Sequence, residues 1–369
     1  MKKIVLVILL LLAVTVCRTK NDNPTGAQLN PADEGTEGWT PVFQPAPERL
    51  ECSENKIVEI LEPVDQNTVV VVNCNLTLEP GDVVTKRLIL QGEASSGVTL
   101  NCNGAEVSPS DIPAHLDSIE VRSVQVDNEW EPAHNVTIQN CNIQGSVRIY
   151  GMGKNGNNNN LTTSSRTLEH TYTARNNAPY HIDLDNITIS GRGRIPLYIA
   201  PGVHHSSLSN STIEGHSTSV MMYLDAETYG ISIYQNVFDA SRAGREAIAL
   251  DGSSYGAIVN NRLLNVPKGG IYLYRNCGEN GTIRHATPSY NEITNNEIRC
   301  IHNIINWYAA IYLGSRDGSR GYCEEDSGYP YGSSVSDQDH VRYNMVTGNE
   351  LHGCLVKSGN KTNHSNTIN

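Results

Sequence analysis

The amino-acid sequence predicts an all-β solenoid, in which coils of about two dozen residues stack along one axis. Two repeated columns predict it, one built around asparagine and one around leucine. Where uninterrupted, both recur at intervals of 23 to 27 residues, and the larger gaps fit one coil plus an insertion, or two coils. The chain has 369 residues, of which 38% are hydrophobic. A chain of this length can bury a core even at that low fraction.

The first 17 residues predict an export signal. Residues 1–3 are basic at two positions, and residues 4–16 form an apolar run that is too short to span a membrane. Cys17 resembles the cysteine of a bacterial lipoprotein box, although Val16 stands where a small residue is usual. Lipidation of Cys17 and ordinary cleavage nearby both stay open. Residues 18–48 predict a flexible tether. We therefore expect an outer-membrane or periplasmic bacterial lipoprotein, or a secreted protein.

An asparagine column marks a corner of the predicted coil. In each repeat one Asn stands between two apolar residues, and the gap before it varies by one residue. Asn tolerates the left-handed conformation of tight turns, and stacked Asn side chains can hydrogen-bond from coil to coil. The members of the column are Asn140, Asn186, Asn210, Asn236, Asn261, Asn296 and Asn349.

The leucine column predicts a strand with one buried face, because apolar residues alternate with others around it. Its buried members are Leu197, Leu224, Leu250, Leu273 and Leu313. The residues on either side of these leucines are expected to point outward. Two outward ladders follow from this register: Tyr198, Asp225, Asp251 and Tyr274 in one, and Tyr223, Tyr272 and Tyr312 in the other.

Three Asn-Cys-Asn motifs, at Cys74, Cys102 and Cys141, each follow a β-rich run. We expect these three cysteines to be free thiols that face inward and fill the core as small apolar groups. Disulfides are expected instead among the later cysteines, whose pairing stays open. These are Cys277, Cys300, Cys323 and Cys354.

Five segments extend the repeats: "GRIPLYIAPGV", "STSVMMYLDAE", "GREAIALDGSS", "GGIYLYRNCGENGTIRH" and "GYCEEDSGYPYGSS". With the Asn turns, they resemble the right-handed parallel β-helix of the pectate-lyase-like superfamily, and within it a group of exported bacterial proteins of unsettled activity. The resemblance implies a single-stranded right-handed parallel β-helix solenoid with loop insertions over residues 49–369. Because enzymes that cleave or epimerise polysaccharides dominate the superfamily, it also implies a polysaccharide partner. Tailspikes and surface proteins are its minority.

Two carboxylates stack in the outward ladders. Asp225 and Asp251 hold the same position in neighbouring coils, about 4.8 Å apart, and Glu227 lies beside them. Like charges at that spacing destabilise a sheet. The pair is therefore expected to share a proton, or to bind Ca²⁺ through Asp225, Glu227 and Asp251. A purely structural network of Asp and Arg that fixes the register is the alternative.

Arginines and tyrosines of the same coils complete the candidate site, since tyrosine rings can stack on sugars and guanidinium groups can clamp a carboxylate or sulfate. The candidate catalytic residues are Asp225, Asp251, Glu227, Glu246, Arg245 and Arg275. The candidate substrate-binding residues are Tyr198, Tyr223, Tyr272, Tyr274, Tyr312 and Arg316. Insertions at residues 150–180 and 314–343 are expected to wall the cleft or to act as spacers.

Two reactions fit this set. A hydrolase would use the carboxyl pair as acid and base or as nucleophile, and the short separation favours retention. A lyase or epimerase would neutralise a uronate with Ca²⁺ or Arg, while Arg275 or Tyr274 removes the proton next to the carboxylate. No complete lyase or polygalacturonase signature occurs in the sequence.

A non-catalytic glycan-binding or envelope structural protein is the alternative to both reactions. The net charge of −12 and the lack of a basic block disfavour nucleic acid as a partner. The oligomeric state stays open.

Overall fold

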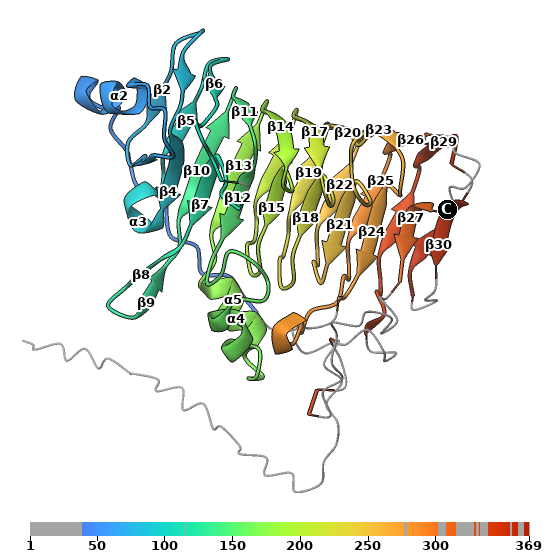
Figure 1. Cartoon of the computed structure of the whole chain (residues 1–369). Helices are drawn as coiled ribbons and strands as arrows, with labels where there is room; N and C mark the ends of the chain where they lie inside the picture. Colours follow the sequence, from blue (N-terminus) through green and yellow to red (C-terminus); the bar gives the residue numbers. More distant parts are fainter. Residues whose placement is uncertain are drawn as a thin grey trace, which may run out of the picture.

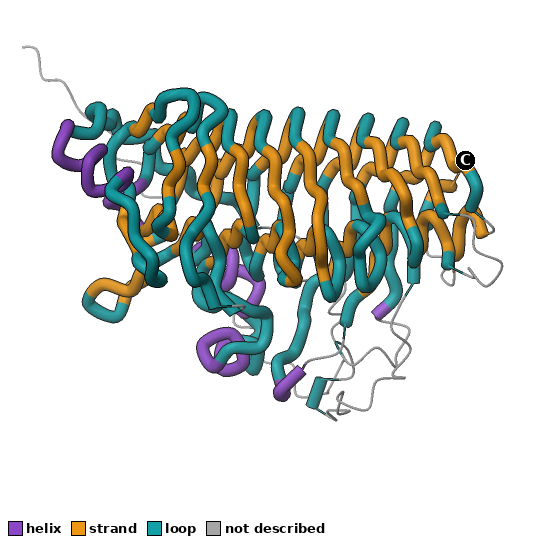
Figure 2. The backbone as a smooth tube through the Cα atoms, turned by 45° about the horizontal axis from the view of Figure 1, so that its top comes forward, coloured by secondary structure: helices purple, strands orange, loops and turns teal. Residues whose placement is uncertain are grey.

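The computed structural model describes residues 39–369, apart from residues 114, 277–278, 302–307, 315–327, 330–331, 333–338, 355, 361–364 and 369. Three long parallel sheets wrap into a right-handed parallel β-helix, which confirms the predicted fold (Figure 1). Each coil adds one strand to each sheet, and Figure 2 shows the coils stacked along one axis.

The strands of each sheet follow one another coil by coil. The first sheet contains β1 (Val69–Val71), β4 (Arg87–Gln91), β7 (Ile119–Arg122), β12 (Val147–Tyr150), β15 (Leu197–Ile199), β18 (Met222–Leu224), β21 (Ile248–Asp251), β24 (Ile271–Tyr274), β27 (Ala309–Leu313) and β30 (Val356–Asn360). The second contains β2 (Leu76–Thr77), β5 (Thr99–Asn101), β10 (His134–Gln139), β13 (Tyr180–Asp185), β16 (Ser207–Ser209), β19 (Ser232–Tyr234), β22 (Ala257–Val259), β25 (Glu292–Thr294), β28 (Met345–Thr347) and β31 (Thr367–Ile368). The third contains β3 (Val83–Val84), β6 (Glu106–Val107), β11 (Asn142–Gln144), β14 (Thr188–Gly193), β17 (Thr212–Ser217), β20 (Val237–Asp239), β23 (Arg262–Val266), β26 (Glu297–Cys300) and β29 (Glu350–His352).

Short elements decorate this solenoid. They are α2 (Glu54–Leu61), α3 (Gly92–Ser95), α4 (Asn159–Ser164), α5 (His170–Asn176), the 3₁₀ turn η1 (Glu279–Gly281) and the antiparallel hairpin of β8 (Val124–Val126) and β9 (Glu129–Glu131). Helix α2 lies at the N-terminal end of the stack (Figure 1), where the Ser53 hydroxyl accepts a hydrogen bond from the Lys56 amide and Ile60 is fully buried. It thereby covers the open end of the core.

Aliphatic rows fill the interior of the coils. In β10 burial alternates residue by residue, as expected for a strand with one face on the core. In the second sheet, the inward-facing residue of each coil pairs in register with the inward-facing residue of the next coil. The row runs Ile138, Leu184, Leu208, Ile233, Ile258 and Ile293.

The asparagines form two columns and not one. Asn140, Asn186 and Asn210 lie at a corner with φ values of 57°, 49° and 51°, the left-handed conformation that Asn tolerates. Asn236 and Asn261 stand one residue further along and are buried. There the Asn261 Oδ1 atom accepts hydrogen bonds from the Asn236 backbone amide at 3.0 Å and from its Nδ2 atom at 2.9 Å. The one-residue variation in the sequence therefore reflects a corner column and an internal ladder.

The predicted register of Tyr198 is wrong by two residues. Ile199, and not Leu197, pairs with Leu224, so Tyr198 lies in line with Tyr223. Both Leu197 and Ile199 face the core, and a shift by two residues keeps the same alternation of buried and outward positions. The apolar pattern alone cannot distinguish these two registers. For the later coils the predicted register is confirmed.

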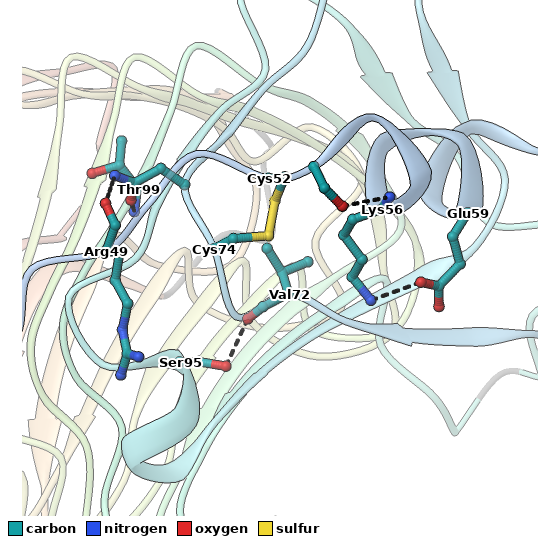
Figure 3. Close-up of a disulfide and its surroundings, with 10 residues drawn as sticks. Arg49, Cys52, Lys56, Glu59, Val72, Cys74, Ser95 and Thr99 are labelled. Atoms are coloured by element: carbon teal, nitrogen blue, oxygen red, sulfur yellow. Dashed lines mark hydrogen bonds and ion pairs between the residues drawn. A yellow bond between two sulfur atoms is a disulfide. The ribbon is translucent and has the colours of Figure 1, made fainter.

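The prediction of free thiols in the Asn-Cys-Asn motifs is also wrong. Cys74 is bonded to Cys52 (Figure 3), and Cys102 is bonded to Cys141. Cysteines on neighbouring coils bring their Cα atoms to 4.9 and 4.8 Å, a separation at which a disulfide can form. Stacked inward cysteines are thus placed for bonding. Among the later cysteines, Cys300 pairs with Cys354, while Cys277 and Cys323 lie outside the described residues.

The structure describes only parts of the N-terminal segment and of the two predicted insertions. The predicted signal and Cys17 lie outside the described residues. The end of the predicted tether is packed on the solenoid, because the Trp39 Nε1 atom donates to Asn176 Oδ1 at 3.0 Å. The insertion at 150–180 contains α4 and α5, and most of 314–343 is not described. Within the described ranges, the structure contains no helix with the length and apolar character needed to cross a bilayer.

Candidate functional site

The outward face of the first sheet carries the two stacked aspartates that the sequence predicted. Asp225 follows β18, and Asp251 ends β21 in the next coil. Because Leu224 pairs with Leu250, the two carboxylates lie one above the other, as predicted. Both are fully buried, since the insertion at 150–180 and the chain after β24 cover this part of the sheet. The predicted open stripe is therefore a covered one.

Arg284 joins the two carboxylates. Its Nη1 atom contacts Asp225 Oδ1 and lies 3.5 Å from Asp251 Oδ2. The Tyr198 hydroxyl donates to Asp225 Oδ2, and the Tyr223 hydroxyl donates to Asp251 Oδ2 at 2.5 Å. The rings of Tyr198 and Tyr223 are stacked, with centroids 5.3 Å apart. We call Asp225, Asp251, Arg284, Tyr198 and Tyr223 the carboxylate network.

Backbone amides complete the carboxylate network. The Ala226 amide donates to Asp225 Oδ1 at 2.8 Å, and the Asn276 amide donates to Asp251 Oδ1 at 2.7 Å. Each of the four carboxylate oxygens therefore accepts at least one hydrogen bond. Gly156 lies directly over the network, because a Cβ atom there would come within 2.5 Å of Asp225 Oδ2.

Burial changes the protonation of the carboxylate network. Burial, aided by the charge of Asp225, raises the pKa of Asp251 against the opposing effect of Arg284. Burial and the adjacent aspartates also raise the pKa values of Tyr198 and Tyr223 well above the usual range, so both hydroxyls remain donors at neutral pH.

Glu227 points into a different environment. Its Oε1 atom accepts from the His285 amide at 2.9 Å, and its Oε2 atom accepts from the Thr171 hydroxyl at 2.6 Å. Burial opposes ionisation of Glu227, but His170, His285 and the Thr171 hydrogen bond outweigh it and lower the pKa to about 2. Among the described residues, no group of three or more His, Cys, Asp or Glu is arranged to hold a metal ion. The structure does not bring Asp225, Glu227 and Asp251 together as ligands, and Ca²⁺ stays a prediction.

Arg245, Glu246 and Tyr274 form a separate group. The Arg245 Nη2 atom donates to Glu246 Oε1 at 2.7 Å and to the Tyr274 hydroxyl at 2.8 Å. The Tyr274 hydroxyl donates to Glu246 Oε1 at 3.0 Å. Arg275 turns away from all of these and pairs with Asp339 at 2.6 Å in a fully buried site.

The tyrosines predicted to bind substrate differ in how exposed they are. Tyr198, Tyr223 and Tyr274 are buried, whereas Tyr272 and Tyr312 are half-buried and their ring centroids lie 5.3 Å apart. Arg316 lies outside the described residues. Two of the five predicted tyrosines are thus open to a ligand in part.

The preceding coils of the same face carry a group of charged residues that was not predicted from the sequence. Glu120 receives Arg87 Nη2 at 2.5 Å, Arg122 Nη1 at 3.3 Å and the Lys154 ammonium group. Its register partner in the next coil is Arg148, whose guanidinium lies 4.0 Å over the ring of Tyr198. Arg148 therefore links this charged group directly to the carboxylate network.

Asp117 is the second buried carboxylate that pairs with these charged residues. Its oxygens lie 2.9 Å from Arg194 Nε, 3.1 Å from Lys154 Nζ and 3.5 Å from Arg148 Nε. We call Arg87, Arg122, Arg148, Lys154 and Arg194 the cationic cluster. In the described part of the chain, these five cations share two buried carboxylates, so positive charge is in excess.

Part of the cationic cluster is open to solvent. The side chains of Arg122, Lys154 and Arg194 are 31%, 27% and 20% exposed. A pocket of about 640 Å³ adjoins the cluster, with Arg192 and Arg194 in its wall.

The sequence signal that could have predicted these charged residues is the leucine-column pattern. It extends upstream as Ile119-Glu-Val121-Arg and Val147-Arg-Ile149-Tyr.

Comparisons with known proteins add little to this description. No protein-family model matches the sequence, and no curated protein matches it. The mannuronan C-5 epimerase AlgE4 A-module of Azotobacter vinelandii is similar at 11% identity and a TM-score of 0.36, over 82% of this chain and 91% of that one. A PL6 alginate lyase in complex with a trisaccharide is similar at 9% identity and a TM-score of 0.25, over 87% and 84%. Similarity this low carries no information about activity.

Proposed function

We propose that the protein is an exported, carbohydrate-active protein that holds an anionic polysaccharide on the outward face of the first sheet. The observation that carries the proposal is the cationic cluster, in which five cations share two buried carboxylates within an otherwise acidic protein. The disulfides Cys52–Cys74, Cys102–Cys141 and Cys300–Cys354 support export, because such bonds persist in oxidising compartments.

The geometry of the cationic cluster favours carboxylate or sulfate groups. The Arg122 guanidinium is fixed by Gln91 Oε1 at 2.6 Å and by Tyr150 at 3.1 Å, and it remains partly exposed. A guanidinium that is already oriented loses less entropy when it binds an anion in a bidentate manner. Arg122 ends β7, Lys154 follows β12 and Arg194 precedes β15, so the exposed charges are spread over three successive coils and suit an extended chain.

Substitution of the exposed cations tests this proposal. In the double variant Arg122→Gln/Lys154→Gln, we expect the Kd for a polyuronate to rise at least tenfold, since a charge-assisted hydrogen bond contributes about 1.5–3 kcal/mol. Arg299→Gln removes one exposed positive charge from the third sheet and serves as the control. Isothermal titration calorimetry with polygalacturonate and alginate provides the measurement. Equal weakening in the control, or none in the double variant, would refute the proposed binding face.

Cleavage at the carboxylate network is a second candidate function. It is favoured by one observation, the raised pKa of Asp251 beside a second carboxyl group, because catalytic acids are tuned in this way. Against it, both carboxylates are buried and every carboxylate oxygen has a donor. The geometry therefore supports binding better than hydrolysis.

Asparagine substitutions test the cleavage candidate. If Asp225 and Asp251 are catalytic, Asp225→Asn and Asp251→Asn each reduce turnover of a cleaved polysaccharide at least a hundredfold while its binding is retained. Reducing-end release and absorbance near 235 nm over a panel of neutral and uronic polysaccharides are the readouts, and Asp239→Asn on the third sheet is the control. Full turnover in both variants removes the carboxyl pair from the reaction.

A further inference from the structure

A second pocket lies at the corner where the first sheet leads into the second. Its volume is about 530 Å³, and its wall includes Trp39, Trp130, Glu93, Glu131, His134 and Tyr180. These residues come from the N-terminal segment, the β8–β9 hairpin, α3, β10 and β13. None of its described lining residues belongs to the cationic cluster or to the carboxylate network. We call it the corner pocket.

Stacked rings make one wall of the corner pocket rigid. The His134 and Tyr180 rings are parallel within 4°, with centroids 5.0 Å apart, and Tyr180 and His204 are parallel within 8° at 5.2 Å. The Tyr180 hydroxyl accepts a hydrogen bond from the Gln44 amide at 2.9 Å. These contacts link the wall to the N-terminal segment.

Trp39 is held in place in the wall of the corner pocket. Its Nε1 atom is bonded to Asn176, the Arg175 guanidinium lies 5.1 Å from its ring, and the His204 ring contacts it edge-on at 5.0 Å. The sequence contains three tryptophans, and two of them line this one pocket. Its aromatic surface is therefore ordered before any ligand arrives, which reduces the entropy lost on binding.

The polar groups of the corner pocket include two carboxylates, whose oxygens are hydrogen-bond acceptors. Glu93 Oε2 lies 3.0 Å from His134 Nε2, and 58% of the Glu93 side chain is exposed. Glu131 adds a second carboxylate. Carboxylates accept from sugar hydroxyls, and the C–H faces of a pyranose pack on indole rings. The positive charge in the wall, Arg175, is fully buried and donates to the Glu227 carbonyl at 2.9 Å.

We propose that the corner pocket binds an uncharged pyranose unit of a glycan. Two carboxylates disfavour a uronate or sulfate group there, whereas the cationic cluster favours one. The two sites therefore select opposite chemistry, and the corner pocket does not depend on the anionic ligand proposed above. A pocket of this size takes one or two sugar units and leaves the rest of the glycan outside.

Calorimetry on the full chain tests the proposal. The probes are gluco-, xylo-, manno- and galacto-configured neutral hexasaccharides, and an oligogalacturonate hexasaccharide. We expect at least one neutral hexasaccharide to bind the wild type, and its Kd to rise about tenfold or more in Trp39→Leu and in Glu131→Gln. Glu129→Gln makes the same charge change in the same strand at an exposed position and should leave the Kd unchanged.

Three outcomes decide between the corner pocket and the cationic cluster. Neutral binding that survives Arg122→Gln/Lys154→Gln but weakens in Glu131→Gln supports the corner pocket. The proposal is overturned if none of the four neutral probes binds at millimolar concentration, or if neither Trp39→Leu nor Glu131→Gln weakens binding in protein whose melting temperature is unchanged. It is equally overturned if Glu131→Gln weakens binding of the oligogalacturonate, because the pocket would then hold an anion.

Discussion

Replacement of Asn261 by leucine is expected to lower the free energy of unfolding by about 3 kcal/mol or more. Its Oδ1 atom accepts from the backbone and side-chain amides of Asn236, and its Nδ2 atom donates to Ile233 O at 2.9 Å and to Asn296 Oδ1 at 3.0 Å. All these groups are buried, and leucine satisfies none of them. Each buried polar group left without a partner costs about 1–3 kcal/mol.

Asn260 provides the matched control for this prediction. It is the neighbouring residue, but it is exposed and occupies the left-handed corner with φ of 56°. Glycine adopts that conformation without strain, so Asn260→Gly should change stability by less than about 0.5 kcal/mol. Urea unfolding followed by circular dichroism measures both variants. Similar losses in the two would show that the internal ladder contributes no more than the corner.

Replacement of Arg284 by methionine is expected to destabilise the protein by about 3–5 kcal/mol at pH 7, because Asp225 and Asp251 would remain buried without their cation. The loss should shrink on acidification. Burial raises the pKa of Asp251 even against the opposing effect of Arg284, so removal of the guanidinium should hold this pKa further above the unfolded value of about 3.9. The unfolding free energy contributed by such groups is fully present below that value and falls as the pH rises through the folded pKa.

The control for this prediction removes the charges as well. Arg284→Met/Asp225→Asn/Asp251→Asn leaves no buried carboxylate in the carboxylate network, so most of the stability at pH 7 should return and its pH dependence should flatten. Thermal melts between pH 4 and 8 provide the measurement. If Arg284→Met loses the same stability at every pH, its effect is steric and the coupling of charges described above is wrong.

The sequence was sufficient for the fold because the signals of a solenoid are local and repeat. The coils were predicted from the alternation around Leu224 and Leu250 and from the Asn corners. The stacking of Asp225 on Asp251 followed from the predicted coils. The register of Tyr198 failed because a shift by two residues preserves alternation. The pairing of Cys102 with Cys141 was missed because the stacked inward cysteines were assigned to apolar packing, although stacking brings their Cα atoms to 4.8 Å, within reach of a disulfide.

The candidate sites were less predictable because they depend on contacts outside the repeat. Arg284 and Gly156 reach the carboxylate network from loops, so the burial of Asp225 has no periodic signal. The corner pocket joins residues as distant as Trp39 and His204. The strand residues beside the cationic cluster were accessible in principle, because Glu120 and Arg148 continue the outward ladder upstream.

The salt dependence of polyuronate binding tests the central claim most directly. If the cationic cluster holds an anionic chain, the Kd of the wild type should rise steeply between about 50 and 300 mM NaCl, and Arg122→Gln/Lys154→Gln should bind weakly with a shallower dependence on salt. A neutral polymer of the same backbone should not compete for this face. Polyuronate binding that is independent of salt, or equally salt-dependent and equally tight in the double variant, would contradict the assignment.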